Sequence, residues 1–121
     1  MVLGFKKQFP DLIMKEIKIH SIREDTHRRW YKGRKIHFAT GSRTKNYNKF
    51  RDGECKGVQA VAILWKSGVP VVYIGEAAFP STANQVALLA KNDGFESTED
   101  FFKWFNKEFR GWIIHWTDFK Y

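Results

Sequence analysis

The side chains best suited to chemistry lie in two segments that are far apart in the sequence. Residues 18–23 read Lys-Ile-His-Ser-Ile-Arg and offer an amine, an imidazole, a hydroxyl and a guanidinium. Residues 93–102 read Asp-Gly-Phe-Glu-Ser-Thr-Glu-Asp-Phe-Phe and place a carboxylate just before a glycine and the start of a helix. If the fold brings the two segments together, they supply a base, a nucleophile and an acid at one site.

These residue types predict acyl transfer through a serine. The Ser21 hydroxyl is a weak nucleophile until a base removes its proton, and Lys18 can act as that base if burial and nearby positive charge lower the pKa of its amine. Asp93 would donate a proton to the leaving amine, which requires desolvation to raise the pKa of its carboxyl group. Backbone amides near Gly94, or the Arg23 guanidinium, would stabilise the oxyanion. This chemistry needs no metal and no organic cofactor.

The geometry of a strand limits this hypothesis. In a regular strand, side chains three positions apart point to opposite faces, so Lys18 and Ser21 converge only if Lys18 lies in a bend before the strand begins. Each residue also has a structural interpretation: Lys18 as a solvated lysine, Ser21 as an ordinary strand residue, and Asp93 as half of an Asp-Gly turn. His20 is a structural or ligand-binding candidate. Glu76, which follows a glycine at a strand end, is a weaker acid candidate.

Hydrophobic periodicity and turn residues indicate the elements that must position these groups. A short helix is expected to begin at residues 9–11, because proline and aspartate favour a first helical turn. Ser97 is expected to cap a later helix that ends at Gly111. The other predicted elements are strands at 18–23, 34–40, 58–65, 69–74 and 112–119, a helix at 82–91 and a polar loop at 41–54. We predict a single α+β domain over residues 1–121, most simply a small mixed or antiparallel β-barrel with two or three short helices.

Positive charge is concentrated in the first half of the chain. The formal net charge is +8, and residues 1–50 hold 13 Lys and Arg against 4 Asp and Glu. A basic face of this kind attracts polyanions, of which nucleic acid is the commonest. In the loop at 41–54, Arg43, Lys45 and Tyr47 combine charge with a ring that can stack on a base. A mobile solvated loop is the alternative. Trp30 is a further aromatic candidate for ligand binding.

Cysteine, histidine and hydropathy patterns narrow the class of protein. With Cys55 as the one cysteine, neither an intramolecular disulfide nor a Cys-based zinc site can form, and the four histidines lack metal-ligand spacing. No apolar run has the length of a membrane helix, and the first residues do not resemble a signal peptide. We therefore expect a cytoplasmic protein with no metal, no cofactor and no association with a membrane.

The chain resembles ASCH domains, which are small β-barrels related to PUA domains. The resemblance covers most of the chain, although the segment at 41–54 is longer than expected. The motifs that carry it are Lys-x-x-Ser-Ile-Arg at 18–23, Trp-Tyr-Lys-Gly at 30–33, Asp-Gly-Phe at 93–95 with Ser97 and Glu-Asp-Phe at 99–101, and Trp-Ile-Ile-His-Trp at 112–116.

This resemblance implies a PUA-like fold and contact with RNA, which PUA-like folds usually bind. Some bacterial ASCH proteins are amidohydrolases that remove the acetyl group from the exocyclic amine of acetylcytidine. Their Lys, Thr and Glu correspond to Lys18, Ser21 and Asp93. Serine keeps the hydroxyl of threonine, whereas aspartate is one methylene shorter than glutamate. The shorter side chain matters because proton transfer needs roughly 2.6–3.2 Å between heavy atoms.

We therefore predict an RNA-binding or nucleoside-binding domain with a ligand cleft lined by basic residues. A metal-independent amidohydrolase that deacetylates N-acetylcytidine through Lys18, Ser21 and Asp93 is the alternative. A regulatory module that binds an acidic protein partner is a third hypothesis. The candidate ligand-binding residues are Arg23, His20, Trp30, Arg43, Lys45, Tyr47 and Glu76.

Overall fold

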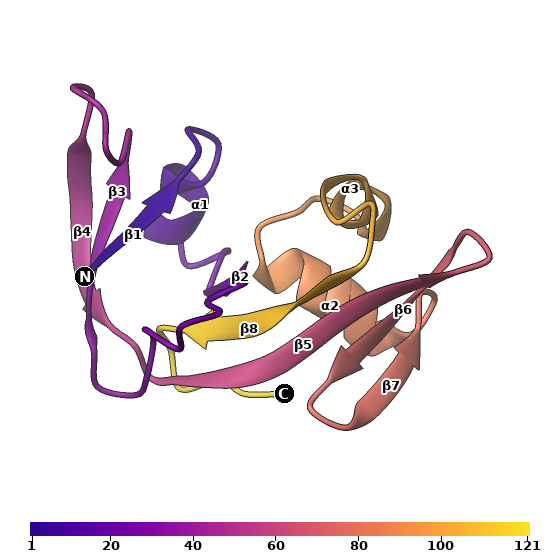
Figure 1. Ribbon diagram of the computed structural model, residues 1–121. Helices are drawn as coiled ribbons and strands as arrows, with labels where there is room; N and C mark the ends of the chain where they lie inside the picture. The colour runs from indigo at the N-terminus through magenta and orange to yellow at the C-terminus, as the bar shows by residue number, and fades with distance from the viewer.

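The computed structural model describes residues 1–121 as eight strands and three helices. One sheet has three strands in the order β1 (Val2–Phe5), β3 (Lys35–Thr40) and β4 (Asn48–Glu54). The other has five in the order β2 (His20–Arg23), β8 (Phe109–His115), β5 (Gly57–Lys66), β6 (Val69–Ile74) and β7 (Ala77–Pro80). In Figure 1 the three-stranded sheet stands at one end of the long strand β5, and the β6–β7 hairpin lies at the other.

The pairing of the strands leaves both sheets open. β1 pairs with β3 in parallel, and all other neighbours are antiparallel. β1 and β4 form the edges of one sheet, and β2 and β7 form the edges of the other. The structure therefore confirms a small α+β fold of two sheets with three helices, and the predicted closed barrel is not confirmed.

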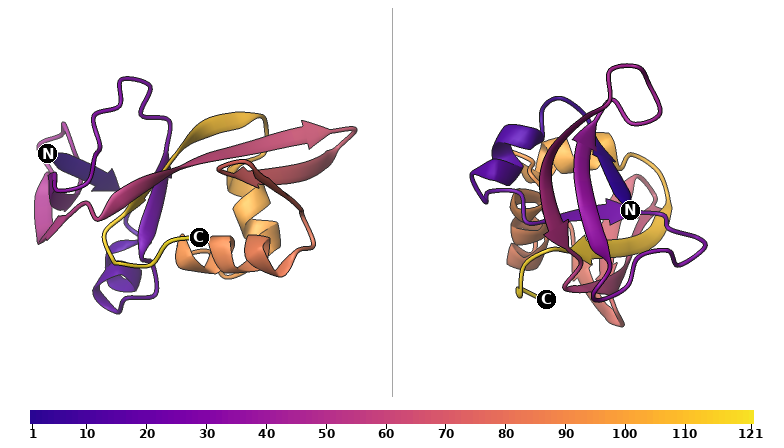
Figure 2. Two further views of the ribbon diagram at one scale, coloured as in Figure 1. Left: turned by 90° about the horizontal axis from the view of Figure 1, so that it is seen from below. Right: turned by 90° about the vertical axis from the view of Figure 1, so that its left-hand side faces the viewer.

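Three short helices complete the fold: α1 (Pro10–Met14), α2 (Asn84–Asn92) and α3 (Thr98–Trp104). As predicted, Ser97 caps α3, since its Oγ accepts a hydrogen bond from the Asp100 amide at 3.1 Å. Figure 2 shows α2 and α3 on the same side of the five-stranded sheet. None of the three helices is both long enough and apolar enough to cross a bilayer.

Several predicted boundaries are wrong. The segment 41–54 was predicted to be a loop, but its second half is β4, which pairs with β3 although it lacks a regular apolar alternation. The short strands β1 and β7 were not predicted. Gly111 lies inside β8 and does not end a helix, because α3 already ends at Trp104. A Cβ at Gly111 would collide with the carbonyl oxygen of Arg23, so glycine there allows β2 to lie close against β8.

Aromatic contacts join the two sheets. Trp116 follows β8, and its ring centroid lies 4.9 Å from that of Phe38 in β3 and 5.9 Å from that of Phe5 in β1. Phe5 and Phe38 also stack on each other at 5.9 Å. These rings belong to one buried cluster that continues to α1, α2 and α3. The core therefore holds α1 and the start of β2 against the end of α2.

Candidate functional site

The two segments singled out in the sequence meet at the end of α2. Asp93 directly follows this helix, and Lys18 lies between α1 and β2. The Ile19 amide donates a hydrogen bond to the Asn92 carbonyl at 2.9 Å, which ties the two segments together. Lys18 therefore lies before the strand, in the bend that its convergence with Ser21 requires.

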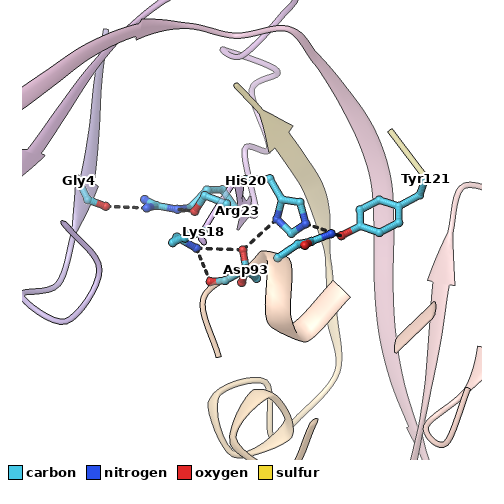
Figure 3. Close-up of polar contacts among 8 residues, drawn as sticks. Gly4, Lys18, His20, Arg23, Asp93 and Tyr121 are labelled. Atoms are coloured by element: carbon cyan, nitrogen blue, oxygen red, sulfur yellow. Dashed lines mark hydrogen bonds and ion pairs between the residues drawn. The ribbon is translucent and has the colours of Figure 1, made fainter. Parts of the chain in front are cut away.

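Lys18 and Asp93 form a buried ion pair. The Lys18 ammonium donates to Asp93 Oδ1 at 3.0 Å and to the Asp93 main-chain carbonyl at 2.6 Å (Figure 3). Only 3% of Lys18 and 4% of Asp93 is exposed. The ammonium also lies 4.7 Å from the centre of the Phe9 ring, in a cation–π contact. Gly94 permits this close approach: its φ is +93°, and a Cβ there would lie 3.1 Å from Lys18 Cδ.

Burial governs the ionisation of this pair. Desolvation lowers the pKa of the Lys18 ammonium, Asp93 opposes that shift, and Arg23 adds to it. Desolvation alone would raise the pKa of Asp93, but the nearby Lys18 and His20 hold it below its usual value. The lowered pKa of Lys18 suits a general base. The pKa of Asp93 is also lowered, because a neighbouring cation stabilises its carboxylate, whereas the predicted role of general acid requires a raised pKa.

Arg23 holds the Ser21 hydroxyl. Arg23 Nε donates to Ser21 Oγ at 2.8 Å, and Arg23 Nη2 donates to the Gly4 carbonyl at 2.6 Å (Figure 3). No hydrogen bond joins Ser21 to Lys18. Because Ser21 Oγ accepts from a guanidinium, its own proton remains free, and the same guanidinium would stabilise an alkoxide there. Arg23 therefore orients Ser21, whereas we had predicted it as one candidate donor to an oxyanion.

A chain of hydrogen bonds continues from Asp93 to Tyr121. His20 is fully buried, and its Nδ1 lies 3.2 Å from Asp93 Oδ1. Its Nε2 lies 2.6 Å from the Tyr121 hydroxyl, whose oxygen accepts a hydrogen bond from Asn92 Nδ2 at 3.1 Å (Figure 3). Desolvation lowers the pKa of His20, and the hydrogen bond to Asp93 opposes this shift. The imidazole thus lies behind the Asp93 carboxylate.

Lys18, Ser21, Arg23 and Asp93 line a single cavity of about 270 Å³. Its other walls are mainly aromatic and aliphatic and come from β1, β2, the start of α1 and the α3 region: Gly4, Phe5, Lys6, Phe9, Ile22, Phe95, Trp104 and Phe105. The rings at positions 9, 95 and 104 contact one another edge to face at 5.6–6.1 Å between centroids. The cavity is therefore lined by a polar cluster and by an aromatic wall, and the Lys18 ammonium lies against one ring of that wall, Phe9.

The remaining predicted ligand-binding residues do not line this cavity. Trp30 is a buried core residue, and His20 is separated from the cavity by Asp93. Arg43, Lys45 and Tyr47 are exposed in the β3–β4 loop, which projects from the body of the molecule in Figure 2. Glu76 is exposed in the turn between β6 and β7. A ligand that touches the loop or this turn would do so outside the cavity.

Two members of the hydrogen-bond chain were not predicted. Asn92 had a visible signal, since the Asn-Asp-Gly run at 92–94 places two hydrogen-bonding side chains at a helix end. Tyr121 had none, because a tyrosine in an aromatic-rich tail gives no periodicity that marks its partner. The aromatic wall of the cavity was visible only as a general excess of phenylalanine and tryptophan.

No cluster of side chains is arranged to hold a metal ion. No group of three or more His, Cys, Asp and Glu residues meets the requirement. The pairs His20–Asp93 and His37–Asp52 each contain one histidine and one carboxylate, at 3.2 and 3.0 Å. In both pairs a lysine ammonium also binds the carboxylate, so a positive charge already lies where a cation would bind.

Comparisons with known proteins assign neither a family nor a fold relative. No protein-family model matches the sequence, and no curated protein and no solved structure matches it. The likeness to ASCH domains therefore depends on the motif residues alone.

Proposed function

We propose that this protein is an ASCH-like domain that binds the base of a nucleoside, free or within RNA. The proposed binding site is the cavity lined by Lys18, Ser21, Arg23 and Asp93. The observation that carries the proposal is the convergence of these four residues, from two distant segments, on one cavity. We also propose that the two sheets correspond to the strands of a PUA-like barrel. The ASCH-like motifs supply both the cavity residues and the bend that brings Lys18 to Asp93.

The size and lining of the cavity favour a single base. Its volume of about 270 Å³ lies just below the range of roughly 300–1,000 Å³ typical of sites for drug-sized ligands. The aromatic wall offers Phe95 and Trp104 as surfaces against which a planar ring can pack. The polar cluster of Lys18, Ser21, Arg23 and Asp93 offers donors and acceptors to the edge of that ring. A folded RNA strand would have to insert one unstacked base.

Asp93 gives the site a preference among bases. Its Oδ1 accepts from Lys18 and His20, whereas its Oδ2 accepts no hydrogen bond from the protein. A carboxylate oxygen can only accept, so it favours a base with an exocyclic amine. We therefore propose that cytidine binds more tightly than uridine, whose corresponding group is a carbonyl.

Isothermal titration with cytidine and uridine tests this function. We expect cytidine to bind at least about fivefold more tightly, since an unmatched buried acceptor costs about 1–3 kcal/mol. Ser21→Ala should weaken binding, and Lys15→Ala, which changes an exposed lysine in α1's C-cap, should not. If neither nucleoside binds at millimolar concentration, or if uridine binds as well as cytidine, the proposal is wrong.

Hydrolysis of an N-acylated cytidine is a second candidate function. The lowered pKa of the buried Lys18 amine favours it, as does the presence of the Ser21 hydroxyl in the same cavity. In its neutral form Lys18 would take the proton of Ser21, directly or through one water. Ser21 Oγ would bond to the acyl carbon and form a tetrahedral oxyanion.

Lys18 then supplies the acid as well as the base in this reaction. Its ammonium would return the proton to the exocyclic nitrogen as the C–N bond breaks, and cytidine would leave. Water, activated by the same amine, would hydrolyse the acyl-serine to a carboxylic acid and restore Ser21. Asp93 would hold Lys18 and bind the exocyclic nitrogen. This replaces the general-acid role predicted for Asp93, which its low pKa does not suit.

Chromatography of N-acetylcytidine after incubation with the protein separates binding from turnover. We expect cytidine and acetate to form, Ser21→Ala to abolish turnover while the substrate still binds, and Ser21→Thr to retain activity because it keeps the hydroxyl. If the wild-type protein binds acetylcytidine without releasing cytidine, the enzyme hypothesis is wrong and the binding function remains.

A further inference from the structure

Tyr121 is fixed by hydrogen bonds at its main chain and its side chain. Its amide donates to Gln59 Oε1 at 2.9 Å, and its carbonyl accepts from Gln59 Nε2 at 3.0 Å. Its hydroxyl accepts from Asn92 Nδ2 and lies 2.6 Å from His20 Nε2 (Figure 3). These contacts place one phenol oxygen against the imidazole that binds Asp93.

The chemistry of the donors fixes the direction of this chain. The Asn92 amide nitrogen can only donate, so the Tyr121 oxygen accepts from it and has its own proton free for His20 Nε2. His20 Nε2 is then an acceptor, and Nδ1 carries the ring proton and donates to Asp93. An ionised Asp93 carboxylate also requires a donor at Nδ1. In a neutral His20, both ends of the chain therefore favour the same tautomer, with the proton on Nδ1.

We propose that Tyr121 is a positioning residue for the cavity: by donating to His20 it keeps the imidazole neutral, with Nδ1–H on Asp93 Oδ1, and leaves Oδ2 for the ligand. The effect on ligand binding rests on the proposed function. The charge and tautomer of His20 do not depend on it, because the hydrogen-bond chain is formed within the protein.

Four titratable groups face His20, and only one of them carries a negative charge that would stabilise an imidazolium. Asp93 is that group, and Lys18 lies on the other side of it as a competing cation. The His115 ring lies 5.4 Å away and donates its Nε2–H to Gln59, and desolvation lowers its pKa to about 3. Tyr121 is the fourth. Near neutral pH, His115 therefore adds no charge.

Loss of the Tyr121 hydroxyl would change the charge on His20. Nε2 would become a buried acceptor without a donor, which costs free energy until a proton and a water satisfy it. The resulting imidazolium would be stabilised by Asp93. Asp93 would then be shared between two cations, and its ion pair with Lys18 would become weaker.

Tyr121→Phe tests the proposal, because it removes one oxygen and keeps the ring. Long-range ¹H–¹⁵N spectra of the His20 ring report its tautomer and charge without any ligand. In the wild type we expect a neutral ring with a protonated Nδ1 from about pH 8 to about pH 6. In Tyr121→Phe we expect His20 to become protonated within this range. Cytidine affinity should fall roughly three- to tenfold, the worth of about one hydrogen bond.

Tyr31→Phe is the matched control, since the Tyr31 side chain is exposed and its hydroxyl makes no hydrogen bond. It should change neither the His20 signals nor the affinity. A wild-type His20 protonated at Nε2, or a Tyr121→Phe variant with unchanged His20 signals, overturns the proposal. If no nucleoside binds, the His20 spectra still decide it, so its failure is distinct from failure of the proposed function.

Discussion

The Lys18 ammonium lies 3.0 Å from the Asp93 carboxylate, with both residues almost fully buried and 75 positions apart in the sequence. The pair fixes the bend before β2 to the end of α2, and it also forms part of the polar cluster that lines the cavity. Structure and proposed function therefore depend on the same two side chains. Isolated charges are costly to bury, so each partner requires the other.

Lys18→Ala should strongly destabilise the protein. It leaves the Asp93 carboxylate buried without its cation, and breaking a buried pair in this way costs about 3–5 kcal/mol. Urea unfolding should show a lower midpoint. The control is Lys15→Ala, whose ion pair with Asp11 has side chains 63% and 74% exposed and should change stability little. Equal effects of the two substitutions would show that Lys18 is not buried against Asp93.

Stability should fall as the pH decreases from about 6.5. The His115 pKa is lowered to about 3, mainly by desolvation, with His20 as a second cause. Between these values the unfolded chain binds a proton at His115 and the folded chain does not, so acid favours unfolding. Urea midpoints at pH 7 and pH 5 measure this effect. His115→Gln should flatten the dependence, whereas the same change at the exposed His27 should not. A rise in stability on acidification would contradict the prediction.

Gly94→Ala should be more harmful than Gly68→Ala. Both glycines have positive φ, +93° and +77°, so alanine is strained at each. Only at Gly94 would the new Cβ also press on Lys18 Cδ, at 3.1 Å, and on the Phe9 ring, at 3.3 Å; at Gly68 nothing lies within 4 Å. The difference between the two unfolding free energies isolates the displacement of Lys18. We expect it to be at least about 1 kcal/mol, with a loss of cytidine binding at Gly94 alone.

RNA should bind through a second, salt-sensitive surface. Arg43 and Lys45 are exposed in the β3–β4 loop, outside the cavity. If they contact phosphates, reversing both charges should reduce the slope of log affinity against log salt for single-stranded RNA, by about 0.7 for each lost contact. The affinity for free cytidine should not change. An unchanged slope would mean that this loop does not contact the RNA backbone.

The sequence allowed prediction of the site more fully than of the sheet. Residues 18–23 and 93–95 have distinctive side chains, and the required bend at Lys18 follows from the two-residue period of a strand. β4 escaped prediction because its residues are polar and its strand character comes from pairing with β3. Gly111 was misread as a helix end, because only the packed structure shows the Arg23 carbonyl that excludes a side chain there.

The ionisation of Asp93 could not be predicted from the sequence either. Burial of a carboxyl group alone raises its pKa, and that was the basis of the predicted acid role. In the structure Lys18 and His20 both bind Oδ1 of Asp93, and together they lower the pKa of this carboxyl group instead of letting burial raise it. The partner of His20, Tyr121, lies in a tail that carries no pattern linking the two residues. Long-range polar partners of this kind are visible only in the folded structure.

The most direct test of the proposed site is an NMR titration of the ¹⁵N-labelled protein with cytidine. We predict saturable shifts of the amides at residues 18–23 and 93–95, together with the Trp104 indole, and little change in the β3–β4 loop. Ser21→Ala should require more cytidine to reach the same shifts. An absence of shifts at millimolar cytidine, or shifts confined to residues 41–47, would contradict nucleoside binding in the Lys18–Asp93 cavity.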